Sequence, residues 1–350
     1  MTSPADLIEM IAQGEQATKL DLAGADLSGA ELGGGVFREL DFRGASLAGA
    51  SMRESIFEDC RFDGADMRGA SLHQSVVYRG SLVGASLEGA TLTGFKLIES
   101  DASEVSFRGA DLRIAAVNAT KLSAACLSGA QLERSAFVEC DTAGIDLRET
   151  ALVAVTVMGA DLRAAKLEGA SFERVVLISA DLSGRSLAGL RFVHTQFMAA
   201  KLEGCDLGGA SVANCNFKDA SLVGCSLVQA HAPNALFVAA DLRDAALVQA
   251  QLTQSIFIDA VLERADCSGA DMQQCILHRA RCAGARFVAT KLRDADFSHA
   301  DLSRADLSGA TMFRTNLHGI LDVDAKIPNR AAALASDPEL AAAEAWTPKY

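Results

Sequence analysis

The sequence predicts an all-β solenoid, a fold in which the chain winds through the same short unit many times. Two observations carry this prediction. From Leu20 to Gly319 the 350-residue chain divides into 60 consecutive five-residue units without one insertion or deletion. Half of the residues are hydrophobic but only 5% are aromatic, which predicts a core of small and medium aliphatic groups. A fixed short period of this kind is the signature of repeat architectures.

Each five-residue unit contains one large apolar position and one small position. Positions whose numbers end in 2 or 7, the central positions, hold Leu in 33 units, Phe in 14, Met in 4 and Val in 4. Positions whose numbers end in 0 or 5 hold Ala, Ser, Cys, Thr or Gly in 51 of 60 units. A period of five matches neither a helix nor a strand, so each unit must turn a corner and point these two side chains inward.

The repeat resembles the pentapeptide-repeat family, whose consensus is A(D/N)LXX. The runs from Ala25 to Gly29 and from Ala305 to Gly309 both read ADLSG, and in-frame copies fill residues 20–319. The resemblance implies a right-handed quadrilateral β-helix with four pentads per coil. Sixty pentads then correspond to a solenoid of about 15 coils, with short capping helices at both ends.

A 20-residue coil is also visible in the sequence without reference to the family. Chance would spread the 14 central Phe residues evenly over four faces, yet one face holds eight of them. This register predicts one quasi-one-dimensional domain in which each coil contacts only its neighbours. The eight residues are Phe37, Phe57, Phe137, Phe197, Phe217, Phe237, Phe257 and Phe297.

The two ends of the chain differ from the repeat. Residues 1–19 are predicted to form a capping helix, because Ser3 and Pro4 give a helix start and Gly14 gives a stop. Residues 320–350 are predicted to form a tail with two short helices, 329–335 and 338–346, the second capped by Asp337. Covering the open end of the solenoid is the expected role of this tail, and recruitment of a partner is the alternative.

No catalytic, cofactor-binding or metal site is predicted, and we expect a protein that is not an enzyme. No nucleophile constellation or phosphate-binding loop stands out. Eight of the nine Cys residues occupy inward positions and only Cys126 points outward, which indicates small buried thiols rather than metal ligands. His278, His299 and His318 fall on one face in successive coils, but without an acid cluster they are interpreted as solvated side chains.

Arg185 is an exception among the small inward positions. An unpaired buried charge is very costly, so we predict a local bulge that lets the guanidinium reach solvent.

Segments for membrane insertion and secretion are also not apparent. No apolar run is long enough to span a bilayer, and the first ten residues lack the basic and apolar regions of a signal peptide. We therefore expect a cytoplasmic protein, which fits the use of nine Cys residues in a reducing compartment.

The Phe-rich face differs from the other three in the side chains that should be exposed. Fifteen outward positions beside its central residues are apolar, whereas each other face has three. Such a stripe would expose about 700 Å², above the patch usual for a monomer. An alternative is that β-branched residues there only favour strand conformation. This set, called the apolar face below, comprises Val36, Ile56, Val76, Tyr78, Ile98, Val138, Met158, Val176, Ile178, Met198, Leu236, Val238, Ile256, Ile258 and Ile276.

The sequence thus predicts a protein–protein interaction or scaffold protein that forms a dimer or docks a protein partner through the apolar face. The resemblance implies a bacterial protein, and the run 297–307 is similar to accessory proteins of bacterial secretion systems. The alternative, which the resemblance to the family implies, is a DNA mimic that modulates type II topoisomerase and protects gyrase. The net charge of −13 argues against direct nucleic-acid binding. It gives the mimic little support, because the most acidic face still carries 13 acids against 9 bases.

Overall fold

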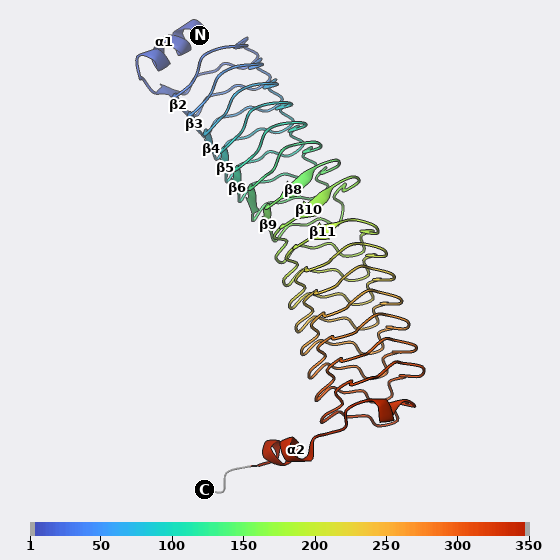
Figure 1. Cartoon of the computed structure of the whole chain (residues 1–350). Helices are drawn as coiled ribbons and strands as arrows, with labels where there is room; N and C mark the ends of the chain where they lie inside the picture. Colours follow the sequence, from blue (N-terminus) through green and yellow to red (C-terminus); the bar gives the residue numbers. More distant parts are fainter. Residues whose placement is uncertain (1–3, 347–350) are drawn as a thin grey trace. The chain divides into compact units, whose positions relative to one another are not determined.

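The computed structural model describes residues 4–346 and confirms a β-solenoid (Figure 1). The chain separates into two compact units, residues 1–181 and 182–350, and each is described here by itself. The longest ladder contains eight strands, fewer than the about 15 coils predicted. The strands are β1 (Ala17–Thr18), β2 (Val36–Arg38), β3 (Ile56–Glu58), β4 (Val76–Tyr78), β5 (Lys96–Ile98), β6 (Ala116–Asn118), β7 (Ala136–Val138), β8 (Ala151–Val153), β9 (Thr156–Met158), β10 (Ser171–Glu173) and β11 (Phe192–Val193).

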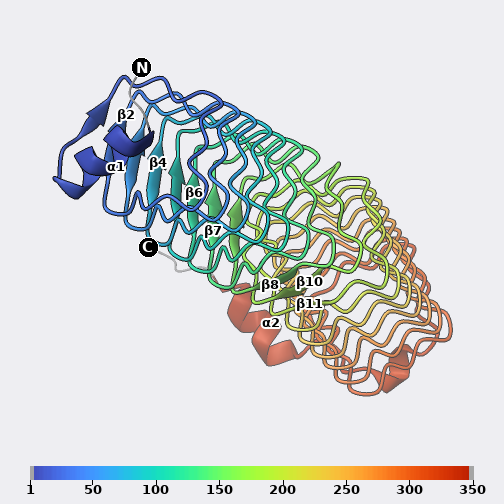
Figure 2. The same ribbon diagram turned by 90° about the horizontal axis from the view of Figure 1, so that it is seen from above.

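The predicted 20-residue coil is present in both units. In the first unit the ladder runs from β1 through β2 to β7 and then to β9, and all neighbours are parallel. Phe37 lies opposite Phe57, one coil further along the chain. Figure 2 shows β2, β4, β6 and β7 following one another along one side of this unit. In the second unit single parallel bridges keep the same step, as from Leu236 to Ile256 and on to Ile276.

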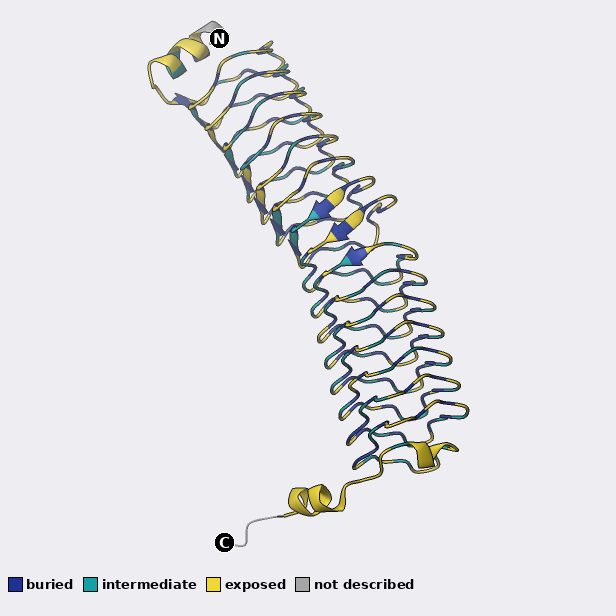
Figure 3. Cartoon of the chain, viewed as in Figure 1, coloured by how far each residue is buried: buried dark blue, intermediate teal, exposed yellow. Residues whose placement is uncertain are grey.

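The core is built from the central positions, as predicted. Every residue at these positions from Leu22 to Leu317 is buried, and buried and exposed segments alternate along each coil in Figure 3. Phe rings stack from coil to coil, with centroids 4.7 Å apart for Phe37 and Phe57 and 4.9 Å apart for Phe217 and Phe237. These columns explain why Phe recurs at 20-residue spacing, because each ring then packs against the ring one coil further along the chain at a favourable centroid distance.

Many buried hydroxyl and thiol groups at the small inward positions have their own main-chain acceptors, whereas the buried Thr195 Oγ1 has none among the described residues. Ser75 Oγ donates to the main-chain oxygen of Met52 at 2.6 Å, and Thr290 Oγ1 donates to that of Cys267 at 2.8 Å. Both acceptors lie 23 residues earlier in the chain. At these positions Ser and Thr therefore replace Ala without leaving the buried hydroxyl unsatisfied.

The corner of each pentad lies at a residue whose number ends in 4 or 9. Backbone φ there is positive, at +66° for Gly29, which explains the Gly at the end of the ADLSG motif. The same conformation is imposed on many other residues, including Ile114 at φ 60°. A β-branched side chain is disfavoured in this region, so the fold overrides local preference at this corner.

The two ends of the chain are covered to different extents. Helix α1 (Pro4–Ala12) contacts β1 and completely buries Leu7, as expected of a cap. Helix α2 (Pro338–Glu344) and the 3₁₀ turn Arg330–Ala332 bury no residue, so the predicted C-terminal covering is realised only in part. Asp337 does cap α2, because its Oδ1 accepts from the amides of Glu339 and Leu340.

No bulge forms at Arg185, contrary to the sequence prediction. Its main-chain nitrogen donates to Leu182 O at 3.2 Å, and its carbonyl accepts from Asp206 N at 2.8 Å. These are the hydrogen bonds of an ordinary pentad. The residue is half-buried and its Nε atom is inaccessible to solvent, so the side chain is accommodated without a change in the backbone.

Candidate interaction surface

The apolar face is positioned by the same strands that align the Phe columns. In a strand of three residues the middle side chain points inward and its two neighbours point outward. Parallel pairing then places Val36 beside Ile56 and Ile56 beside Val76. Tyr78 lies beside Ile98 in the same way. The predicted outward residues therefore form two columns along the ladder of the first unit.

These side chains are less exposed than isolated surface residues would be. Ile56, Met158 and Ile276 are 45%, 38% and 36% exposed, and the other twelve members of the apolar face are half-buried. Neighbouring strands are about 4.8 Å apart, so each aliphatic side chain covers part of the next one. Within each unit, neighbouring apolar side chains therefore lie against one another in ribs one coil apart rather than as separate projections.

Charged groups interrupt the first part of this face. Arg38 Nε lies 2.8 Å from Glu58 Oε2, and Arg79 bridges Glu58 and Asp59 at 2.9 and 2.7 Å. The Arg79 guanidinium also lies 4.3 Å from the centroid of the Tyr78 ring. Its hydrogen bonds lower the pKa of the Asp59 carboxyl below the usual range. The residues around Tyr78 therefore form a mixed surface.

The corresponding columns of the second unit contain no charged side chain between residues 236 and 276, although Asp259 and Arg279 pair at 2.7 Å at the adjoining corner. Leu236, Ile256 and Ile276 follow one another in one column, and Val238 and Ile258 occupy the column beside it. In each of the two coils that contain residues 236 and 256, both outward positions of this face are thus aliphatic. We call these five residues the 236–276 patch. The 236 and 256 coils are two successive coils in which branched aliphatic side chains fill both columns.

Acidic residues elsewhere on the surface are paired with arginines two positions later. Asp111 and Arg113 approach to 2.7 Å, as do Asp161 and Arg163. The hydrogen bonds from these arginines lower the pKa of Asp111 and of Asp161 to about 2 in each case. Alternation of this kind neutralises the acidic rows locally instead of producing the unbroken negative line of a nucleic-acid backbone.

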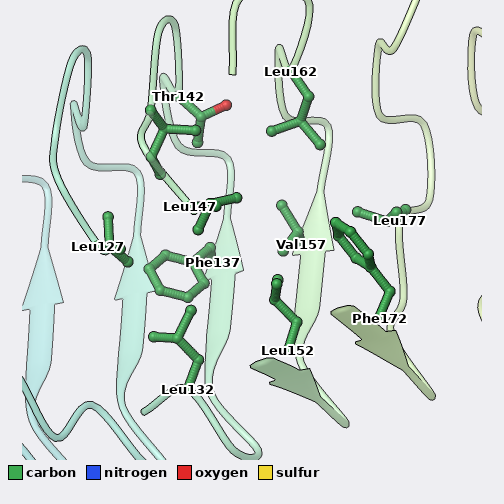
Figure 4. A pocket seen from close by; sticks show the side chains of 11 residues that line it. Leu127, Leu132, Phe137, Thr142, Leu147, Leu152, Val157, Leu162, Phe172 and Leu177 are labelled. Atoms are coloured by element: carbon green, nitrogen blue, oxygen red, sulfur yellow. The ribbon is translucent and has the colours of Figure 1, made fainter. Parts of the chain in front are cut away.

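An enclosed apolar cavity lies in the core of the first unit (Figure 4). Leu127, Phe137, Leu152 and Phe172 are among its lining residues, and its volume is about 20 Å³. Thr142 replaces the usual large central residue there, and its Oγ1 donates to Asp161 O at 3.0 Å. Ligand pockets occupy about 300–1,000 Å³, so this space is a packing defect rather than a binding site.

The cysteines are buried as predicted, with Cys126 half-buried. The Sγ atoms of Cys205 and Cys225 lie 3.0 Å apart, while Cys215 Sγ contacts Phe192 O at 3.3 Å in a different part of the coil. Burial raises the pKa of Cys215 to about 12, so its thiol stays protonated. The three residues are not brought together as a ligand set.

The structure corrects the interpretation of the histidines. The side chain of His318 is only 5% exposed, so it is not a solvated group. Its Nε2 lies 3.0 Å from Glu344 Oε2, and His299 Nε2 lies 3.2 Å from Glu344 Oε1. Sequence reasoning missed Glu344, because the acid comes from helix α2 and no repeat register places this helix beside the last coils.

The comparisons with known proteins agree with the repeat. The family model described as pentapeptide repeats matches in eight copies, over residues 21–59, 36–74, 81–113, 158–192, 195–231, 240–279 and 280–319. None of the curated proteins matches the chain in sequence. Within the described residues, no helix combines the length and the apolar character that crossing a bilayer would require.

Several solved structures are similar to this chain. One is HetL, a pentapeptide repeat protein involved in heterocyst differentiation regulation, from the cyanobacterium Nostoc sp. strain PCC 7120. HetL is 21% identical to this chain. The match covers 90% of this chain and 97% of HetL, with a TM-score of 0.28. A trypsin-treated form of QnrB1, a plasmid-mediated fluoroquinolone resistance protein, is 18% identical over 73% of this chain and 94% of that chain, with a TM-score of 0.23. The pentapeptide repeat protein Rfr23 from the cyanobacterium Cyanothece 51142 is 22% identical over 33% and 91%, with a TM-score of 0.22.

Proposed function

Because the chain belongs to the pentapeptide-repeat family, we propose that it is a non-enzymatic scaffold that associates with a protein through its apolar face. The occupant we favour is a second copy of the same chain, with a different protein as the alternative outcome of the test. The observation that carries the proposal is the 236–276 patch, where five aliphatic side chains in two adjacent columns contact solvent without a charged residue among them.

Strand propensity alone does not account for this patch. Several residues of the other faces occupy equivalent outward positions, and these are mostly Asp, Ser, Arg or Lys although they pair with the same parallel geometry. A β-branched residue is useful wherever a strand forms, so propensity would enrich all four faces alike. Enrichment on one face favours burial against another surface, because contiguous exposed apolar patches mark interaction sites.

The proposal is tested by the mass of the purified protein in solution. We expect the wild type to be a dimer by light scattering, and the double variant Val238→Glu/Ile258→Lys to be a monomer. The matched control is Val83→Lys. This residue also follows directly after a central position and is 36% exposed, but it lies off the apolar face. It should leave the mass unchanged. Circular dichroism melting should show that all three proteins remain folded.

Two results separate the possible occupants. A monomeric wild type whose chemical cross-links to a protein partner are lost in the double variant would assign the face to that partner. A monomeric wild type with identical behaviour in all variants would contradict the proposal and leave strand propensity as the explanation of the face.

The finer roles predicted from the family remain separate predictions. A role as a DNA-mimicking modulator of gyrase would be supported by strong protection of supercoiling activity against a fluoroquinolone. The local Asp–Arg pairing leads us to expect no such effect. A cytoplasmic location, suggested by the nine Cys residues, and a role as a secretion-system accessory would be tested by fractionation and by cross-linking in cells.

A further inference from the structure

We propose that His299, His318 and Glu344 bind a divalent transition-metal ion of the zinc class, which fastens helix α2 to the last coils of the second unit. One donor atom from each residue lies within 4.8 Å of the other two. Imidazole nitrogen and carboxylate oxygen are common zinc ligands, and two His with one Glu leave the fourth tetrahedral position for water. The site goes beyond the proposed scaffold function and does not depend on it.

The distances between donors suit a shared ion. His318 Nε2 lies 3.0 Å from Glu344 Oε2, and His299 Nε2 lies 3.2 Å from Glu344 Oε1. Two ligands at about 2.0–2.1 Å from a tetrahedral ion are separated by about 3.3 Å. Small side-chain rotations therefore suffice to place one ion between the three groups, and no backbone movement is needed.

The two histidines are held in place before any ion binds. His318 is buried, and its ring meets the His299 ring edge-on with centroids 5.2 Å apart. The His299 ring in turn lies against Gly319, where an added Cβ would stand only 2.6 Å from His299 Nδ1. The absence of a side chain at Gly319 thus leaves the space that the His299 ring occupies.

His278 extends the same row of rings but is not part of the ligand set. Its Nε2 lies 3.1 Å from Arg279 Nη1, which can only donate, so this nitrogen acts as an acceptor. Its Nδ1 lies 2.8 Å from Ser298 Oγ. Both ring nitrogens are therefore occupied, and His278 provides a matched control for the two proposed ligands.

One hydrogen bond opposes metal binding. The Asp337 amide donates to His318 Nδ1 at 3.2 Å, which places the ring proton on Nε2, where it faces Glu344. An ion at Nε2 moves this proton to Nδ1, so the imidazole stays neutral and the Asp337 amide loses its acceptor. The lost bond is long and the gained bonds are coordinate bonds to an ion, so we expect binding, weakened by the loss of this contact.

The direct experiment is titration of the chelator-treated full-length protein with Zn²⁺ against a chromophoric competitor, together with the visible absorption of bound Co²⁺. We expect one equivalent to bind in the micromolar range, with the absorption of a tetrahedral Co²⁺ site. Glu344→Gln and His318→Asn should each weaken binding by at least about 10-fold, and His278→Asn should not. Circular dichroism should show that each variant retains the fold of the wild type.

A glycine pair tests the geometry without removing a ligand. Gly319 and Gly309 both have a left-handed backbone, with φ of +62° and +73°. An added Cβ at Gly309 would meet its nearest atom at 3.7 Å, so Gly309→Ala has the same backbone strain without a clash. We expect only Gly319→Ala to weaken Zn²⁺ binding. Absence of binding below millimolar Zn²⁺, or equal binding by Glu344→Gln and the wild type, would overturn the proposal and leave a hydrogen-bonded clamp.

Discussion

Two stretches of the apolar face share one backbone and differ in their surface. Around Tyr78, the columns contain Arg38 and Glu58, which pair at 2.8 Å, and Arg79 at the adjoining corner covers the Tyr78 ring. In the 236–276 patch Val238 and Ile258 occupy the positions of Arg38 and Glu58, while the adjoining corner keeps a charged pair, Asp259 with Arg279. The repeat thus fixes where each side chain points, and residue identity alone decides whether the surface is suited to association or to solvent.

The consequence for function is that association should concentrate in one part of the face. Desolvating the paired charges around Glu58 would cost free energy that burying Ile256 or Ile258 does not. A partner that contacts both stretches would therefore gain most of its binding free energy from the second unit. The predictions below test this difference, beginning with the largest effect.

Core truncation should affect both stretches equally, because the same Phe columns support them. Phe57 and Phe217 are fully buried and stack on neighbouring rings at 4.7 and 4.9 Å. We expect Phe57→Ala and Phe217→Ala each to lower the free energy of unfolding by about 3–5 kcal/mol, as measured by denaturant melts. A loss below about 1 kcal/mol at either site would contradict the view that the stacks support the face above them.

Removing the charges should make the first stretch resemble the second. Arg38→Val combined with Glu58→Val extends the aliphatic columns, and we expect association of this variant to tighten about 10-fold, or by about 1.4 kcal/mol, in sedimentation experiments. In the matched control, Arg61 and Asp63 are likewise replaced by valine. These two residues form an ion pair at 3.3 Å on either side of the central Phe62, which does not belong to the apolar face. Equal tightening in the control would mean that added hydrophobicity anywhere promotes association.

Stability can be raised at one corner without touching either stretch. Ile114 has φ 60° and is 59% exposed, so its side chain adds little burial while its backbone is strained. We expect Ile114→Gly to stabilise the protein by about 1 kcal/mol in thermal melts. Ala124→Gly, at φ 57°, should give a smaller gain because Ala is not β-branched. A loss of stability in Ile114→Gly would show that the side chain makes a contact that outweighs the strain.

Much of this architecture could be predicted because it depends on period alone. The inward direction of Leu and Phe at central positions, the small partners and the Phe columns all follow from a 20-residue register. The position of Glu344 could not be predicted, since it depends on how a non-repetitive tail returns to His299 and His318. The sequence shows that Glu58 is a charged residue within the apolar face. Only the structure shows that Glu58 pairs with both Arg38 and Arg79.

The smallest effect concerns Asp–Arg pairs, which occur in both units as Asp111 with Arg113 and Asp241 with Arg243. The arginine hydrogen bonds lower the pKa of both carboxyls, and that of Asp111 reaches about 2. A lowered pKa in the folded state means that the contribution to stability is complete above the unfolded value near 3.8 and is lost as the pH falls towards 2. We expect Asp111→Asn to lower stability at pH 7 by about 0.5–1 kcal/mol, as for other partly exposed pairs. The difference from the wild type should shrink as the pH falls from the unfolded pKa through the folded value of about 2. Melts of the wild type and of Asp111→Asn across this range check the prediction, with Asp241→Asn as the counterpart in the second unit. A difference from the wild type that persists unchanged at pH 2 would mean that Asp111 acts through packing rather than through its charge.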